Sequence, residues 1–161
     1  MWDVWHATPT APMLIEQPPL LYRLLFPEAL WRIKRQGGQQ VFITFDDGPI
    51  PQVTPWVLDT LDRYGIKATF FMVGNRVASY ASTVKRMADL GCETDSHTWA
   101  HTYLTGMSEG EILQSLNQTR DAIVAAGGNA PKGVRPPGGK INDASKAVLA
   151  KAGMPSIIWS V

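Results

Sequence analysis

The stretch Val41–Pro49, with the sequence VFITFDDGP, decides how the rest of the chain is interpreted. Its apolar run of β-branched and aromatic residues predicts a buried strand, which stops at the adjacent carboxylates of Asp46 and Asp47. Gly48 and Pro49 then predict a turn. Because α/β proteins place their chemistry at the carboxyl ends of strands, the two carboxylates are candidates for two different roles. A solvated Asp-Asp turn is the simpler alternative.

The composition indicates one domain with an ordinary core and no polyanionic partner. The chain has 161 residues, and 15 Lys and Arg against 14 Asp and Glu give a net charge of +1. The absence of a basic run or an aromatic–basic alternation argues against nucleic-acid binding. No apolar stretch reaches a membrane-spanning length, and the N-terminus lacks the form of a signal peptide. The single Cys92 excludes an internal disulfide and is expected to be buried at a strand start.

The first 40 residues are expected to form an N-terminal extension, of which residues 1–12 resemble an expression tag or a graft. Residues 18–34 carry apolar side chains at helical spacing, and Pro27 is expected to divide them into two short helices. These helices could pack under a barrel or bind a partner.

From residue 41 onward, expected strands alternate with expected helices. The strands are expected at 41–45, 68–73, 92–96, 133–135 and 156–161, and the helices at 55–64, 81–90, 109–126 and 143–153. Helix caps are expected at Thr54, at Ser108 with Glu111, and at Asn142. This alternation predicts an α/β fold with a mainly parallel sheet. About four βα units are fewer than a closed (β/α) barrel needs, so residues 41–161 are expected to form an incomplete barrel.

Two later motifs add candidate chemistry at other predicted strand ends. His97 and His101 lie four residues apart, so a helical turn or a tight loop would bring both imidazoles to one cation. Two histidines and a carboxylate such as Asp47 leave positions open on a metal ion, as catalytic sites require. Arg135 could pair with a carboxylate at the same edge of the sheet, where the predicted strands end. The following PPGG lets the backbone pass close to a ligand. Surface histidines and a rigid loop with a solvated arginine are the simpler alternatives.

Together these motifs resemble those of the NodB-homology polysaccharide deacetylases, carbohydrate esterase family 4. The resemblance is carried by TFDDGP at 44–49, ATFF at 68–71, HTWAH at 97–101 and RPPGG at 135–139, and it extends over residues 41–161. It implies a deformed (β/α) barrel that removes N-acetyl groups from a chitin-like or peptidoglycan-like glycan containing N-acetylglucosamine. It also implies an exported or cell-envelope location.

The resemblance implies a metal centre. Asp47, His97 and His101 would bind a divalent cation, most often Zn²⁺, with Co²⁺, Ni²⁺ or Mn²⁺ as alternatives. A metal-bound water has a pKa of about 7, which makes it a usable nucleophile at neutral pH.

The resemblance also implies roles for the remaining motif residues. Asp46 would act as general base and Arg135 would hold it. Pro137 and Gly138 would line the substrate site, where the N–H of Gly138 would stabilise the oxyanion. Gly138 replaces a tyrosine that is frequent in the family, so an aromatic wall is expected to be missing.

Two further family motifs are not found in this chain. The fourth, Asp-x-x-Asp-Trp, would begin just after 159–161, and the fifth contains the histidine that serves as general acid. His6 could replace that histidine only if the N-terminus folds across the rim. Two alternatives therefore remain open: an inactive relative that binds metal and glycan, or a partial barrel with an unpaired apolar edge at 157–159. Such an edge predicts a homodimer or a complementary C-terminal chain, with little acetate release from this chain alone.

Overall fold

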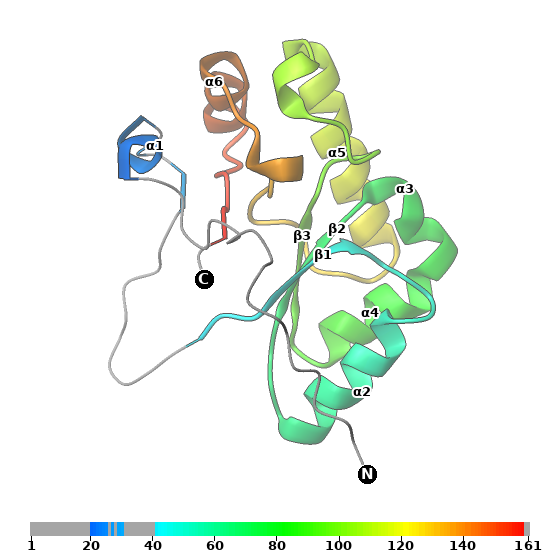
Figure 1. Cartoon of the computed structure of the whole chain (residues 1–161). Coiled ribbons are helices and arrows are strands. Elements are labelled where there is room, and N and C mark those ends of the chain that lie inside the picture. The colour runs from blue at the N-terminus through cyan, green and yellow to red at the C-terminus, as the bar shows by residue number, and fades with distance from the viewer. Residues whose placement is uncertain (1–19, 26, 28, 31–40, 160–161) are drawn as a thin grey trace.

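Three parallel strands form the regular part of the sheet (Figure 1). The computed structural model describes residues 20–25, 27, 29–30 and 41–159. Within them the strands are β1 (Thr44–Gly48), β2 (Thr69–Met72) and β3 (Glu93–Ser96), in the order β1-β2-β3. Isolated parallel bridges continue the sheet from Ser96 to Val134, from Val134 to Ser156, and from Ile157 to Leu30. The described sheet is open, as the prediction of an incomplete barrel required.

Helices connect and cover these strands. They are α1 (Leu20–Leu25), α2 (Thr54–Tyr64), α3 (Gly74–Val77), α4 (Ala81–Asp89), α5 (Glu109–Ala125) and α6 (Asp143–Lys151), with short 3-10 turns at 78–80, 104–106 and 137–139. In Figure 1, α2, α4 and α5 lie along one side of the three strands. None of the helices in the described residues is long and apolar enough to cross a membrane.

The main core lies between these helices and β2. Alternate β2 side chains point to opposite faces, so Phe70 and Met72 pack against apolar residues of α2, α4 and α5. Phe71 faces the other way and lies under the guanidinium of Arg135, 3.9 Å from its ring centroid. Cys92 is fully buried just before β3, as predicted. Thus β2 separates a helix-covered apolar face from the face that carries the polar motif residues.

Several predicted helix ends are confirmed. Ser108 and Glu111 form a capping box at the start of α5, and Asn142 forms one with Ser145 at the start of α6. Gly65 ends α2 in the left-handed conformation with a φ of 64°. These ends are set by residues a few positions apart, and local sequence is therefore enough to find them.

The first strand and the first cap differ from the prediction. β1 begins at Thr44 rather than at Val41, and it includes both carboxylates. Val41 is 87% exposed because β1 is an edge strand of the described sheet, paired only with β2. Thr54 is the first residue of α2 rather than its cap, and its hydroxyl accepts a hydrogen bond from the Ile50 N–H instead.

The last part of the sheet also differs from the prediction. The expected strands at 133–135 and 156–161 are reduced to single bridges at Val134, Ser156 and Ile157, and residues 160–161 lie outside the described part. The expected second N-terminal helix is wrong at Leu30, whose N–H donates to the Ser156 carbonyl (2.8 Å) and whose carbonyl accepts from Ile158 (3.2 Å). The edge at Ile157 therefore has a partner within the same chain. Residues 1–12, the predicted tag or graft, lie outside the described residues.

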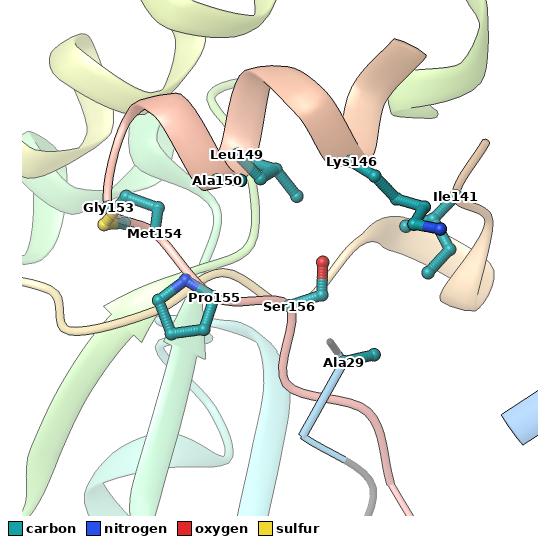
Figure 2. Close-up of a pocket in the computed structure, with 9 residues that line it drawn as sticks. All are labelled: Ala29, Ile141, Lys146, Leu149, Ala150, Gly153, Met154, Pro155 and Ser156. Carbon is teal, nitrogen blue, oxygen red and sulfur yellow. The ribbon is translucent and has the colours of Figure 1, made fainter. Parts of the chain in front are cut away.

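An apolar pocket of about 280 Å³ lies beneath α6 (Figure 2). Figure 2 shows Leu149 and Ala150 of α6 on one side of it and Ala29 across from them. Among the described residues that line it, Lys146 is the one basic side chain. None of the motif residues singled out from the sequence is among the described residues that line this pocket.

Candidate functional site

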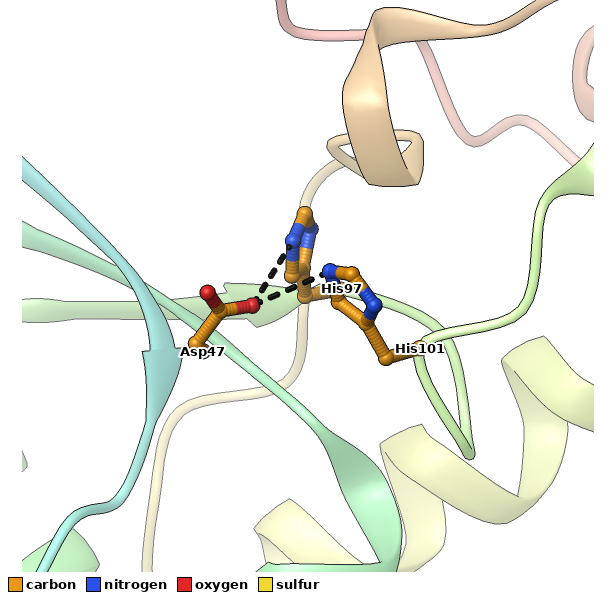
Figure 3. A group of neighbouring side chains, drawn as sticks. All are labelled: Asp47, His97 and His101. Atoms are coloured by element: carbon orange, nitrogen blue, oxygen red, sulfur yellow. Dashed lines mark ion pairs between the residues drawn. The ribbon is translucent and has the colours of Figure 1, made fainter.

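The structure brings Asp47, His97 and His101 together (Figure 3). Asp47 belongs to β1, whereas both histidines lie in the loop after β3. An Asp47 carboxylate oxygen lies 3.4 Å from His97 Nε2 and 3.1 Å from His101 Nε2. The carboxyl ends of β1 and β3, the two parallel strands on either side of β2, thus place one ligand type beside the other, and a loop rather than a helical turn gathers the imidazoles.

The hydrogen bond of His97 Nδ1 determines which ring nitrogen of His97 carries the proton. His97 is 3% exposed, and its Nδ1 lies 2.7 Å from the backbone carbonyl of Arg135. A carbonyl can only accept, so Nδ1 carries the proton and donates. Burial lowers the pKa of His97, which favours the neutral imidazole. The Nε2 lone pair of that neutral ring then faces the Asp47 carboxylate.

This spacing fits a metal ion. Two acceptor atoms that face each other without a proton repel, and a cation between them removes the repulsion. Ligand atoms about 2.1 Å from a tetrahedral zinc ion lie about 3.4 Å apart. The contacts of Asp47 with His97 and His101 measure 3.4 and 3.1 Å. The side chains of Asp47 and His101 are 53% and 44% exposed, so a cation held there would have an open side toward solvent and substrate.

Asp46, next in sequence to Asp47, contacts a different residue. Its carboxylate oxygen accepts a hydrogen bond from Arg135 Nη1 at 2.7 Å. The same Nη1 donates to the hydroxyl of Thr44 at 2.8 Å. Arg135 is 3% exposed, whereas the side chain of Asp46 is 33% exposed and is therefore accessible to water. The two adjacent carboxylates therefore face different partners.

The turn at 137–139 carries the predicted substrate-side residues. Pro137 is buried and has no N–H, whereas Gly138 is exposed, has an N–H and adopts a φ of 61°. A Cβ at Gly138 would lie 3.2 Å from a ring atom of Tyr103. Tyr103 is 46% exposed, and its ring supplies an aromatic surface beside this turn, where the sequence predicts that an aromatic wall is missing.

Sequence reasoning missed two residues of this region. Thr44 could have been found from strand alternation, because it shares a face with Asp46 two residues later. Tyr103 has no such signal, since its approach to Gly138 depends on the fold of two separate loops.

Comparison with known proteins places the chain in one family. A family model described as polysaccharide deacetylase matches residues 33–157. The peptidoglycan-N-acetylglucosamine deacetylase PgdA of Listeria monocytogenes is 41% identical over 128 residues, which are 80% of this chain and 27% of that protein. The chain spans about a quarter of the length of the first curated relatives that it matches.

Solved structures agree with this placement. A family 4 carbohydrate esterase from Streptomyces lividans, in complex with acetate, aligns with a TM-score of 0.71 and 36% identity over 75% of this chain and 62% of that one. A family 4 acetyl xylan esterase from Clostridium thermocellum, in complex with a cobalt ion, aligns with a TM-score of 0.64 and 38% identity over 66% of this chain and 53% of that one.

Proposed function

The chain belongs to the polysaccharide deacetylase family, and we propose that it carries the metal-binding and base-bearing part of a hydrolase that removes N-acetyl groups from an amino-sugar polymer. The observation that carries this proposal is the divergent orientation of two adjacent carboxylates. Asp47 faces His97 and His101, whereas Asp46 faces Arg135. Hydrolysis of an amide needs both an activated water and a base, and these two environments suit those two tasks.

We assign the metal to Asp47, His97 and His101. A divalent cation bound there, Zn²⁺ in the first instance and Co²⁺, Ni²⁺ or Mn²⁺ as alternatives, would supply the Lewis acidity that activates water and the acetyl carbonyl. The ligand set of two imidazoles and one carboxylate supports zinc, and a relative with a cobalt ion supports a site that accepts similar metals.

We assign proton transfer to Asp46 and its positioning to Arg135. The bond from Arg135 fixes one carboxylate oxygen, and the partly exposed carboxylate can take a proton from the attacking water. Water adds to the acetyl carbon as it gives a proton to Asp46, the C–N bond breaks, the sugar amine leaves with a proton taken from solvent, and acetate is released. The backbone N–H of Gly138, an exposed residue, is our candidate oxyanion donor.

The proposed substrate is a glycan containing N-acetylglucosamine. The named activity of the Listeria relative supports a peptidoglycan-like polymer, and a chitin-like polymer is the alternative from the sequence. An exported or cell-envelope location and a homodimer or complementary chain stay predictions. The second candidate function is a binding relative that holds metal and glycan without turnover.

Zinc titration of the full chain tests the proposed metal centre. We expect one tight zinc per chain in the wild type and loss of that binding in His97→Ala and in His101→Ala, because each removes one of three ligands. His6→Ala, the chain's third histidine, is the matched control and should bind normally. Unchanged zinc binding in both ligand variants would contradict the assignment.

Acetate release from N-acetylglucosamine oligomers then tests turnover. We expect a low release that depends on added zinc and disappears in His97→Ala. Zinc and oligomer binding with no release above the metal-free background would favour the binding relative instead.

A further inference from the structure

Three non-glycine residues at the candidate metal centre have left-handed backbones. The φ angles are 65° for Asp47, 67° for Thr98 and 56° for His101. A β-branched residue is especially unfavourable there, and Thr98 is also fully buried with no hydrogen-bond partner for its hydroxyl in the described residues. Such conformations persist only where the surrounding structure fixes them. Contacts from outside β1 and the loop at 97–101 are therefore needed.

The segment that makes these contacts is Gly74–Arg76, at the start of α3. The Gly74 N–H donates to the Thr98 carbonyl at 3.0 Å, and the Asn75 N–H donates to the Trp99 carbonyl at 2.9 Å. The backbone between His97 and His101 is thus held by two amides of one short segment.

The same segment holds Asp47 through a side chain. Arg76 Nη1 donates to the backbone carbonyl of Asp47 at 2.6 Å. This is a contact with the left-handed residue itself rather than with its carboxylate, so it fixes the backbone and leaves the carboxylate free to face the histidines. One segment therefore fixes the backbones that carry all three candidate ligands.

The position of Gly74–Arg76 is fixed in turn by close packing on α5. A Cβ at Gly74 would lie 2.5 Å from Thr119 Oγ1 of α5 and 2.6 Å from a ring atom of Trp99. No side chain fits there, which keeps the segment pressed against α5 and beside the loop that it holds. A segment this constrained can hold both the end of β1 and the loop at 97–101 in fixed positions.

We propose that Arg76 is a positioning residue for the metal centre, which holds Asp47 in the backbone conformation that presents its carboxylate to His97 and His101. This inference rests on the proposed metal site. Arginine suits the task because its planar, always charged guanidinium makes a directional bond to a carbonyl that a flexible ammonium reproduces only in part.

The test compares Arg76→Met and Arg76→Lys with the wild-type chain. We expect Arg76→Met to weaken zinc affinity about 10- to 100-fold, as loss of an outer hydrogen bond to a metal ligand does, and Arg76→Lys to regain part of that loss. The visible absorption of bound Co²⁺ should also change in Arg76→Met, because it reports ligand geometry. Arg63→Met, at an exposed arginine at the end of α2, is the control and should keep wild-type affinity and spectrum.

The possible outcomes are distinct. Wild-type zinc affinity and Co²⁺ spectrum in Arg76→Met would overturn the role of Arg76 and leave the metal site in place. An equal loss of affinity in Arg76→Met and Arg63→Met would also overturn it, as a non-specific charge effect. A wild-type chain that binds neither zinc nor cobalt would overturn the proposed metal site together with this inference.

Discussion

Replacing Arg135 with methionine tests how much the contacts of one buried guanidinium, including its bond to the candidate base Asp46, stabilise the fold. Methionine has a similar length and fills the space, so the change removes polar contacts without opening a large cavity. The lost contacts are hydrogen bonds to Asp46 and Thr44 from Nη1, one to the Ile157 carbonyl from Nε (3.2 Å), and stacking over Phe71. The substitution therefore disconnects β1 from the segment around Ile157.

The expected cost of Arg135→Met follows from these contacts. The partly exposed Asp46 pair contributes about 1 kcal/mol. The bonds to Thr44 and Ile157 contribute about 1 kcal/mol each, and the contact with Phe71 contributes about 1 kcal/mol. Relief of the desolvation of the guanidinium offsets part of this, leaving about 3 kcal/mol. For a chain of this length that lowers Tm by about 6–12 °C.

Thermal unfolding followed by circular dichroism measures this change. Arg120→Met is the matched control, because the side chain of Arg120 is 50% exposed and pairs only with the neighbouring Asp121 in the described ion pairs. We expect the control to melt within about 2 °C of the wild type. If Arg135→Met also melts within about 2 °C of the wild type, the bonding assigned to Arg135 does not stabilise the fold.

Two further predictions concern a second motif residue and a helix cap. Asp46→Asn should keep zinc and lower zinc-dependent acetate release about 100- to 10,000-fold, because an amide cannot accept the proton; loss of zinc instead would reverse the roles of Asp46 and Asp47. Hydrogen bonds from Ser108 lower the pKa of Glu111, so their stabilisation is present above the unfolded pKa and is lost as pH falls through the folded pKa. The difference in Tm between wild type and Glu111→Gln should therefore shrink between about pH 6 and about pH 3, and a constant difference would contradict this.

The parts of the fold that were predictable depend on nearby residues. The capping boxes at Ser108 and Asn142 and the stop at Gly65 are each set within one helical turn. The start of β1 was not predictable in this way. Val41 is an apolar β-branched residue of the kind usually buried in strands. It is exposed because the described sheet has no further strand on that side of β1.

In the candidate site, too, some features could be predicted from nearby sequence and others could not. Asp47 and the two histidines could be grouped from sequence because the carboxyl ends of all the parallel strands in one sheet, here β1 and β3 on either side of β2, lie at the same edge. The contact of Arg76 with Asp47 could not, since it joins a side chain to a backbone carbonyl across a fold-dependent distance. The residue types in the motifs indicate which chemistry is possible, whereas the contacts that orient those side chains depend on tertiary structure.

The bridge between Leu30 and Ile157 has a consequence for the order in which the chain folds during synthesis. β1, β2 and β3 pair with their neighbours in sequence, so they can assemble once the helices between them have left the ribosome. Leu30 emerges early, yet its partners at Ser156 and Ile158 are made more than a hundred residues later. Throughout that interval the exposed leucines of α1 are tethered to a folding domain without this anchor. A chaperone that binds apolar segments would therefore meet this segment of the nascent chain before the segment pairs with the sheet.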